Sequence, residues 1–575
     1  MLKLKNFKID NIMKTKYLFF IVVMVFCFGN SFSQQNQTDL DAQRITIYTD
    51  YTIALQDANR MQYLPVIEDT IKVEPEFNYS IQPIVYQTRY TPTMINAASL
   101  REEPLPILDN GLIKLGVGNY LSPYIEVFYN NTYERDFSVG AYAKHHSTHG
   151  KARNAAGQQI YTGFNKNDFL VYGKRFLKNS TLSGDIGFNS NEIYYYGYDP
   201  DAQMIDNPRD KEELEMQRWM NLNPKVRFNS NNIFDKKFNY DLLLDYSYLF
   251  NVTDDYHHTA KIGGDFSIAS NNNKYGLESK FIYHNGFVDS IEDEDKYLIL
   301  NPYYKNYSDA WQIKLGVNTT GDFFKADSVN YHFYPNILIQ HNVSNVIIPY
   351  VSFKGHLEDN CLNSIRKINP YIQRLPHIEA TNYAQVLDIG VKGNISRKAY
   401  FHINGNYSKI DNKVFFVNDT SEMPLNNKFI LEYTNIERFS GYGEISLRNI
   451  IPDFNFILKG NYYYYSYVKN KEKPWHMPEL DISFSVEYQY TDDITFGSDI
   501  FFIGKRYAKE YDKDLNIIER ELDPIIDINL YANYTLASNF SCFLYLNNLL
   551  GQKQYVWNHY HSLGFNLLLG LKYSF

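Results

Sequence analysis

Histidine residues are the side chains in this sequence whose type and spacing come closest to a metal-binding pattern. His145, His146 and His149 lie close together, and His257 and His258 form a second group. Imidazole is the commonest metal ligand in proteins and also binds haem iron, so either group could form a metal or haem site in a receptor loop. Adjacent residues of a strand point to opposite faces, however, so His145 and His146 cannot both face one site. We therefore interpret both groups as exposed rim histidines and expect neither metal nor cofactor.

Other residue types give no better candidate for chemistry. The sequence has neither a nucleophile elbow nor a phosphate-binding loop, so an outer-membrane protease or lipase has no supporting motif and we expect no enzyme. The three cysteines, Cys27, Cys361 and Cys542, show neither a disulfide framework nor zinc spacing. The tyrosine-rich run 461–467 could stack on sugars, but we favour an aromatic girdle at a membrane interface.

Acidic residues fall on the polar side of segments in which every second residue is apolar. Clear examples are residues 238–251, 480–490 and 526–536. A period of two with unlike faces is typical of a strand that separates two environments. We expect the apolar side to face lipid and the acidic side to face a wet lumen, where carboxylates would favour cations over anions. These lumen-facing candidates are Asp241, Asp245, Asp481, Glu487 and Asp527.

The composition also favours a membrane β-barrel. The chain of 575 residues contains 52 Tyr and 39 Phe but only 4 Trp, and 17% of its residues are aromatic. Its mean hydropathy is nevertheless negative. Interfacial aromatic girdles together with a polar lumen explain both facts. The net charge of -9 argues against a nucleic-acid partner, which normally needs a basic surface.

Short polar connections alternate with longer ones along the chain from residue 107 to 575. Ten short connections separate eleven hairpins and predict about 22 strands, beginning near Leu112. A soluble sandwich or propeller also alternates, but the long strands and the absence of a blade-length repeat count against it. We predict an all-β, transmembrane, antiparallel up-and-down β-barrel. The short connections are expected near Thr132, Asn179, Asn231, Asn272, Asp309, Val343, Arg397, Ile451, Asp492 and Ser538.

One of the longer connections has a helical pattern. Pro208 to Met220 carries three glutamates early and Met216 and Trp219 later, and proline suits a first helical position. The sequence therefore predicts a short helix on an extracellular loop here.

The N-terminal region carries targeting information. Lys14 and Lys16 precede the apolar residues 17–29, and small residues follow, so we predict a leader and signal peptide over residues 1–33 with cleavage between Ser33 and Gln34. The apolar run is too short to span a bilayer comfortably. Residues 34–106 are polar with scattered prolines, which predicts an extended periplasmic segment.

In the C-terminal segment, every second residue is apolar up to the last residue of the chain. This strand must close the barrel, so its lipid face must be apolar throughout. It also resembles the signal read by the outer-membrane assembly machinery, which places the chain in the outer membrane with the lipid bilayer and that machinery as partners. The alternating residues are Phe565, Leu567, Leu569, Leu571, Tyr573 and Phe575.

Residues 548–557 and 569–575 resemble the end of TonB-dependent receptors, where an Asn-Leu-Phe turn and a terminal aromatic close a 22-stranded barrel. Leu550 stands where that family has Phe. The resemblance covers about residues 105–575 at the level of architecture and implies transport across the outer membrane. That family also has a globular plug inside the barrel. The residues between Ser33 and the first strand are too few for one, so we expect a plug-less relative, which residues 73–80 and 144–147 also resemble.

Three functions remain open from the sequence. The first is a receptor-like transport protein for an unknown solute, the second a passive channel or porin, and the third a structural subunit whose N-terminal segment docks a protein partner. An unfilled lumen of this size would leak solutes. We therefore expect residues 34–106 to thread into the lumen and the loop 358–380 to fold inward.

Overall fold

The computed structural model describes the chain from residue 109 onward, with short gaps. The predicted signal peptide, its cleavage site at Ser33 and Gln34, and the predicted periplasmic segment 34–106 lie outside the described residues. A compact unit extends from Glu102 to Phe575. No described helix has the length and apolar character needed to cross a membrane. The described residues are 109–131, 134–153, 157–198, 209–231, 238–323, 329–344, 346–373, 378–419, 427–467, 472–511 and 516–575.

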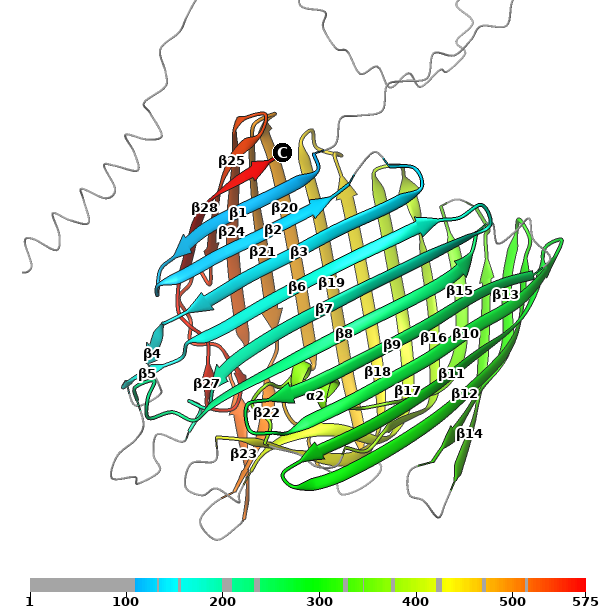
Figure 1. The fold of residues 1–575 in the computed structure, drawn as a ribbon, viewed down its shortest axis with the longest axis horizontal. Coiled ribbons are helices and arrows are strands. Elements are labelled where there is room, and N and C mark those ends of the chain that lie inside the picture. Colours follow the sequence, from blue (N-terminus) through cyan, green and yellow to red (C-terminus); the bar gives the residue numbers. More distant parts are fainter. Residues whose placement is uncertain are drawn as a thin grey trace, which may run out of the picture. The chain divides into compact units, whose positions relative to one another are not determined.

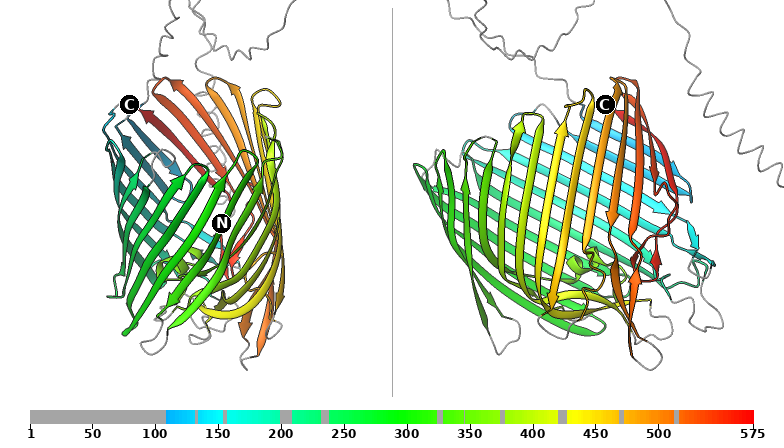
Figure 2. Two further views of the ribbon diagram at one scale, coloured as in Figure 1. Left: turned by 90° about the vertical axis from the view of Figure 1, so that its right-hand side faces the viewer. Right: turned by 180° about the vertical axis from the view of Figure 1, so that it is seen from behind.

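The main sheet is antiparallel, has 22 strands and closes on itself. Each strand of this sheet pairs with the next strand of the same sheet along the chain, and β1 pairs with both β2 and β28, so that Leu112 stands opposite Ser574. The sheet therefore forms a closed barrel, whose strands we call the wall (Figures 1 and 2). The predicted fold class and the strand count are confirmed. The wall strands are β1 (Gly111–Gly118), β2 (Ser122–Asn130), β3 (Phe137–Thr148), β6 (Phe164–Phe176), β7 (Ser180–Tyr194), β8 (Met216–Ser230), β9 (Phe238–Asn251), β10 (Tyr256–Ser270), β11 (Asn273–Val288), β12 (Ile291–Tyr307), β13 (Trp311–Asp322), β14 (Asn330–His341), β15 (Ile348–Glu358), β16 (Thr381–Ser396), β17 (Ala399–Asn418), β18 (Phe429–Arg448), β19 (Phe454–Tyr467), β20 (Leu480–Thr491), β21 (Ile494–Ile503), β24 (Ile525–Ala537), β25 (Phe540–Asn547) and β28 (Asn566–Ser574).

The two ends of the barrel differ in their connections. The tightest predicted turns, at Asn272, Asp492 and Ser538, join their strands at the end that also holds the C-terminus (Figure 1). We call this the short-turn end and the opposite one the loop end. Asn271 adopts φ 51, a left-handed conformation that asparagine tolerates in such turns. The connections at the loop end contain β4 (Lys151–Arg153), β5 (Gln159–Tyr161), α2 (Leu362–Ile368), β22 (Arg506–Tyr511), β23 (Ile517–Leu522), β26 (Tyr555–Trp557) and β27 (Tyr560–His561).

The helix predicted for Pro208 to Met220 is wrong. Met216 already belongs to β8 and stands opposite Tyr194 of β7. The described residues before it form a turn in which the carboxylate of Glu213 accepts the backbone N–H of Arg209 at 2.7 Å. Pairing with the neighbouring strand and burial of the inward side chains outweighed the local helical pattern.

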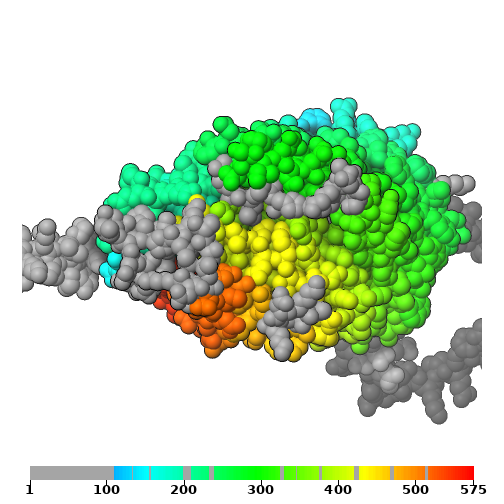
Figure 3. Space-filling view, turned by 90° about the horizontal axis from the view of Figure 1, so that it is seen from below, coloured from blue at the N-terminus to red at the C-terminus, as the bar shows by residue number. Residues whose placement is uncertain are grey.

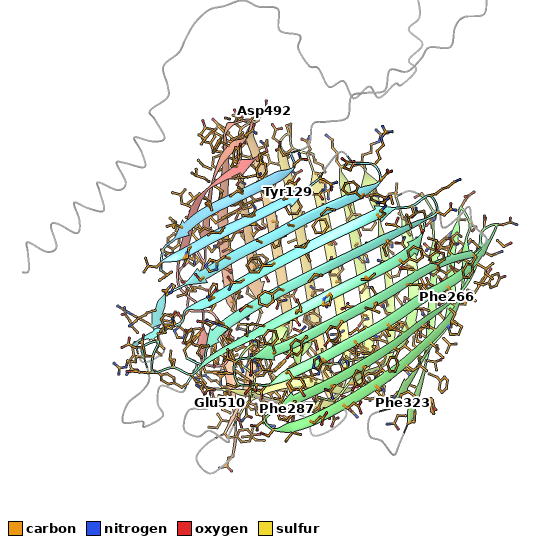
Figure 4. All side chains as sticks on the ribbon, in the orientation of Figure 1. Tyr129, Phe266, Phe287, Phe323, Asp492 and Glu510 are labelled. Carbon is orange, nitrogen blue, oxygen red and sulfur yellow. The ribbon has the colours of Figure 1, made fainter. Side chains whose placement is uncertain are left out.

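The outer surface of the wall is apolar and banded. Exposed aromatic side chains lie near both ends, with aliphatic ones between them, and Figure 4 labels Tyr129 and Phe266 toward the short-turn end and Phe323 toward the loop end. Such a band between two girdles is the surface that a membrane-spanning barrel presents to lipid. In the C-terminal pattern, Leu567 is half-buried and the other five residues are exposed; their role as an assembly signal stays a prediction. The exposed aliphatic residues include Val171, Ile186, Leu244, Ile262, Leu315, Ile389, Ile403, Ile445, Leu569 and Leu571.

On the lumen side, tyrosine rings tie neighbouring strands together. Tyr303 of β12 stands opposite Gly276 of β11, and its ring lies where a Cβ atom of that glycine would be. Its hydroxyl reaches past the glycine and donates to Asp265 Oδ1 on β10 at 2.8 Å. We call this three-strand contact a tyrosine clasp. It recurs as Tyr172–Gly140–Asn130 and Tyr531–Gly497–Glu487. It also recurs as Tyr350–Gly390–Asn404, where Asn404 Nδ2 donates to the hydroxyl of Tyr350.

Candidate functional site: a cap at the loop end

Several connections at the loop end leave the wall at separate strands and meet one another. Seen from this end, the yellow part of the chain occupies the middle of the face, between the orange part and the green part (Figure 3). We call these segments the cap and define it as residues 194–198, 359–373, 472–477, 506–511 and 555–561. The cap is where segments far apart in the sequence come together, so it is the candidate functional site.

Helix α2 places an apolar face in the middle of the cap. Leu362 and Ile365 are each only 1% exposed and belong to a buried cluster with Phe416, Phe429 and Tyr560. A helix of seven residues is marginal by itself, so its stability comes from this packing. Burying each aliphatic side chain contributes about 1.5–3 kcal/mol. The prediction that the loop 358–380 folds inward is confirmed for its described residues.

Stacked tyrosines join three of the connections. The ring of Tyr371 lies 3.6 Å from that of Tyr560 between centroids, and Tyr196 meets Tyr560 edge-on at 5.0 Å. Tyr195 donates its hydroxyl to the carbonyl oxygen of Ile372 at 2.9 Å. Burial raises the pKa of Tyr195 to about 12 and also raises the pKa of Tyr371 and Tyr560, so the rings stay neutral. The sequence places these residues in different loops, and only the folded barrel brings them together.

An ionic cluster from two connections and the wall lies beside the apolar part of the cap. Glu510 of β22 contacts His559 Nε2 at 2.9 Å and accepts from Arg520 Nη1 at 3.2 Å; Figure 4 labels it at the loop end. Burial opposes ionisation of Glu510, but the hydrogen bond and charge of His559 outweigh it and lower the pKa of Glu510 to about 2. Lys509, also on β22, bridges to Glu432 Oε1 of the wall at 2.8 Å. The cluster therefore ties β22 to both another connection and the wall.

The predicted acidic residues do not form a common site. They lie on β9, β20 and β24, and each has a polar neighbour on the wall. Arg227 and Lys225 neutralise Asp241 and Asp245, which weakens the predicted preference for cations at β9. Each of the five accepts a hydrogen bond: Asp241 from Arg227 Nε at 2.7 Å, Asp245 from Asn223 at 2.8 Å, Asp481 from Asn461 at 2.7 Å, Glu487 from Tyr531 at 3.2 Å and Asp527 from Asn529 at 3.3 Å.

The histidines are also separated. His145 contacts Asn167 Oδ1 at 2.7 Å, whereas the ring of His146 packs against Tyr124 with centroids 5.6 Å apart. Within the described part of the chain, no three His, Cys, Asp or Glu side chains are grouped in a way that could hold a metal ion. His257 and His258 also have different neighbours. The ring centroid of His257 lies 5.6 Å from that of His284, and the ring centroid of His258 lies 4.7 Å from that of Tyr248.

Two cavities border the cap. One, of about 340 Å³, lies between Tyr196, Tyr371 and the wall residue Asp527. The other, of about 440 Å³, lies between α2 and the loop-end halves of β6 to β9. Sequence reasoning missed the second cavity and its residue Arg366. The available signal was the spacing of Leu362 and Ile365, which puts both on one face of a helix but is too short to stand out.

Comparison with known proteins rests on structure alone. No family model matches the sequence, and no curated protein matches it. Among solved structures, the ferric enterobactin receptor PfeA of Pseudomonas aeruginosa in complex with enterobactin is similar with TM-score 0.60 and 14% identity, covering 81% of each chain.

Two further structures agree. The pyoverdine-bound FpvA of P. aeruginosa has TM-score 0.62 and 12% identity over 81% of this chain and 71% of its own. The FrpB iron transporter of Neisseria meningitidis has TM-score 0.64 and 9% identity over 82% of both chains. At such low identity the likeness establishes the fold: the chain forms the 22-stranded barrel of TonB-dependent receptors.

Proposed function

We propose that this chain is an outer-membrane transport protein with the barrel of a TonB-dependent receptor, and that its own cap gates the lumen. The observation that carries the proposal is the buried cluster around Leu362 and Ile365, which joins loops from separate parts of the wall across one mouth. The banded exterior supports placement in a lipid bilayer. The proposal includes no catalytic step.

A passive channel fits the cap poorly. A porin needs a lumen that stays open to water, whereas here apolar side chains and stacked tyrosines lie between the walls. Opening that path means exposing the cluster, so permeation must be coupled to movement of the cap. The solved neighbours are named for iron and siderophores, which makes ferric chelates the first solutes to test.

Ion conductance in planar bilayers tests the gate. Leu362→Asp places a carboxylate in the apolar cluster, while the matched control Ile368→Asp changes a residue of the same helix that is 57% exposed. We expect a small conductance for the wild type and for the control, and a large one for Leu362→Asp. A large, steady conductance of the wild-type protein would instead establish the passive channel.

Uptake by cells tests the transport itself. Cells that make the wild-type protein should accumulate radioactive iron from a ferric chelate faster than cells that lack it. If uptake is unchanged and the closed protein purifies in a fixed ratio with another outer-membrane protein, the structural-subunit function is correct and the transport proposal fails.

A further inference from the structure

A groove of about 580 Å³ crosses the outer surface of the wall near the short-turn end. Its volume falls within the range of ligand pockets. It is formed by β3, β6, β7 and β8, which pair with one another in this order and lie side by side in Figure 1. Each of its apolar side chains is at least 38% exposed, so a ligand in the groove can contact all of them. These side chains are Phe137, Val139, Leu182 and Val226.

Two glycines on adjacent strands form the floor of the groove. Gly173 of β6 stands opposite Gly184 of β7, and the exposed residues Val139 and Val226 flank the pair in the same row. A Cβ atom at Gly173 would meet nothing closer than 3.8 Å, and one at Gly184 nothing closer than 3.5 Å. Neither glycine has a positive φ, so the backbone conformation does not account for them. The groove therefore exists because two side chains are absent from the outer face.

An arginine stands beside the glycine row on the same face. Arg175 lies two residues closer to the short turn on β6, opposite Phe137 and Leu182, and all three side chains are exposed. Lys174 is the other cation of the lining, but it alternates to the lumen side, and the lining includes no carboxylate. A long cationic side chain near the rim of a barrel reaches the level of the lipid headgroups. A guanidinium also matches the geometry of phosphate oxygens.

We propose that this groove binds one glycerophospholipid of the periplasmic leaflet. Arg175 donates to the phosphate oxygens, and an acyl chain lies over Gly173 and Gly184. The order along β6 fits this ligand, because the short-turn end of such a barrel faces the periplasm and the glycines lie deeper in the bilayer than the arginine. The binding does not depend on gating or transport, so conductance and uptake test those functions separately.

A second glycine pair shows what the arginine adds. Gly405 of β17 stands opposite Gly441 of β18 and, on its other side, opposite the exposed residue Ile389. A Cβ atom at either glycine would meet nothing closer than 3.9 Å. The next outward residues of β17, Ile403 and Tyr407, carry no charge. This pair therefore offers space for an acyl chain without a partner for the phosphate, and it serves as a matched control.

Native mass spectrometry of the mature protein in detergent tests the site. The probe is palmitoyl-oleoyl phosphatidylglycerol, compared with the diacylglycerol that has the same two chains and with inorganic phosphate. We expect one phosphatidylglycerol to bind with a Kd at least roughly tenfold lower than that of the diacylglycerol, the factor expected for one hydrogen bond to a charged group. We expect no bound inorganic phosphate. Equal binding of both lipids, binding of neither, or binding of inorganic phosphate alone would overturn the proposal.

Variants assign the binding to the groove. Arg175→Gln should raise the Kd for phosphatidylglycerol at least roughly tenfold. The matched control Arg448→Gln removes a cation at the same end of the barrel but on the lumen side of β18, opposite Asn455, and should leave the Kd unchanged.

Filling the groove separates it from a simple interfacial arginine. Gly173→Leu keeps Arg175 but occupies the space for the acyl chain, so it should also weaken binding, whereas Gly405→Leu should not. Unchanged affinity in Gly173→Leu, with the barrel folded by heat-modifiable gel mobility, would reject the groove as the site. A co-purifying protein that occupies this face in place of lipid, and is lost in Gly173→Leu, would also overturn the proposal.

Discussion

The wall and the cap bury apolar residues in opposite directions. In the wall, apolar side chains such as Leu244 and Ile262 point outward, and polar ones line the lumen. In the cap, apolar side chains such as Leu362 and Tyr560 pack into a common cluster, as in a soluble protein. The difference shows that one chain follows two rules: the wall presents apolar side chains outward, the surface expected of a barrel in a bilayer, whereas the cap buries them against one another. A substitution that suits one of the two regions should therefore destabilise the other.

Removing the closing contacts of the wall should have the largest effect. Gly111 N donates to Phe575 O at 2.8 Å, and Phe575 N donates back to Gly111 O at 3.0 Å. Deleting Tyr573 to Phe575 removes both bonds together with part of the β1–β28 pairing. We expect a strong loss of folded protein from the outer membrane, measured by heat-modifiable gel mobility of that fraction. An unchanged folded band would show that the wall closes without its last residues.

A charge on the lipid side should be the next most damaging change. Phe484 lies on the apolar face of β20, and Asp481 lies on its polar face bonded to Asn461. Phe484→Arg should cost about 2–4 kcal/mol near the midplane, whereas Asp481→Leu should be tolerated better. Folding yields in lipid vesicles measure both variants. Equal yields would mean that the two faces of β20 are not as different as the pattern indicates.

A small truncation inside the cap should act locally. Ile365→Val removes one methylene from the buried cluster and should destabilise the cap by about 0.5–1.5 kcal/mol. Ile368→Val, on the exposed side of α2, is the matched control. Hydrogen exchange should become faster in residues 361–372 only for Ile365→Val. Equal acceleration in the wall strands would show that cap and wall unfold as one unit.

The smallest effect concerns pH. A carboxyl group with a lowered pKa stabilises the fold above its ordinary pKa of 4.5 and loses that contribution as the pH falls toward about 2. The contribution of Glu510 to the cap should therefore be constant between pH 5 and 8 and decline only below that range. Conductance recorded from pH 7 down to pH 3 should rise at the acidic end. Glu510→Gln should remove most of that dependence.

The sequence predicts the wall well because lipid imposes a local pattern. Alternation along residues 238–251 or 480–490 is visible within one strand, and tight turns such as the one at Asn272 mark its end. The count of strands follows from adding such units. The same reasoning failed at 208–220, where a run of glutamates suggested a helix but pairing of β7 with β8 extends through Met216.

The cap could not be predicted because its contacts join distant parts of the chain. Tyr196 donates its hydroxyl to the backbone of His561, 365 residues away. Nothing near either residue in the sequence indicates the other. Helix α2 has only seven residues, and Arg366 looks like an ordinary basic residue at a helix end until Trp219 and Gln217 are placed beside it.

The tyrosine clasps also bear on how the wall assembles. A clasp forms only if a ring, a glycine and a hydrogen-bonding partner on three successive strands arrive level with one another. A slip of one residue turns the ring to the lipid side and loses the contact entirely. The four clasps are spread around the barrel, at β2–β6, β10–β12, β15–β17 and β20–β24. The observed register is therefore favoured over a slipped one at four places around the wall.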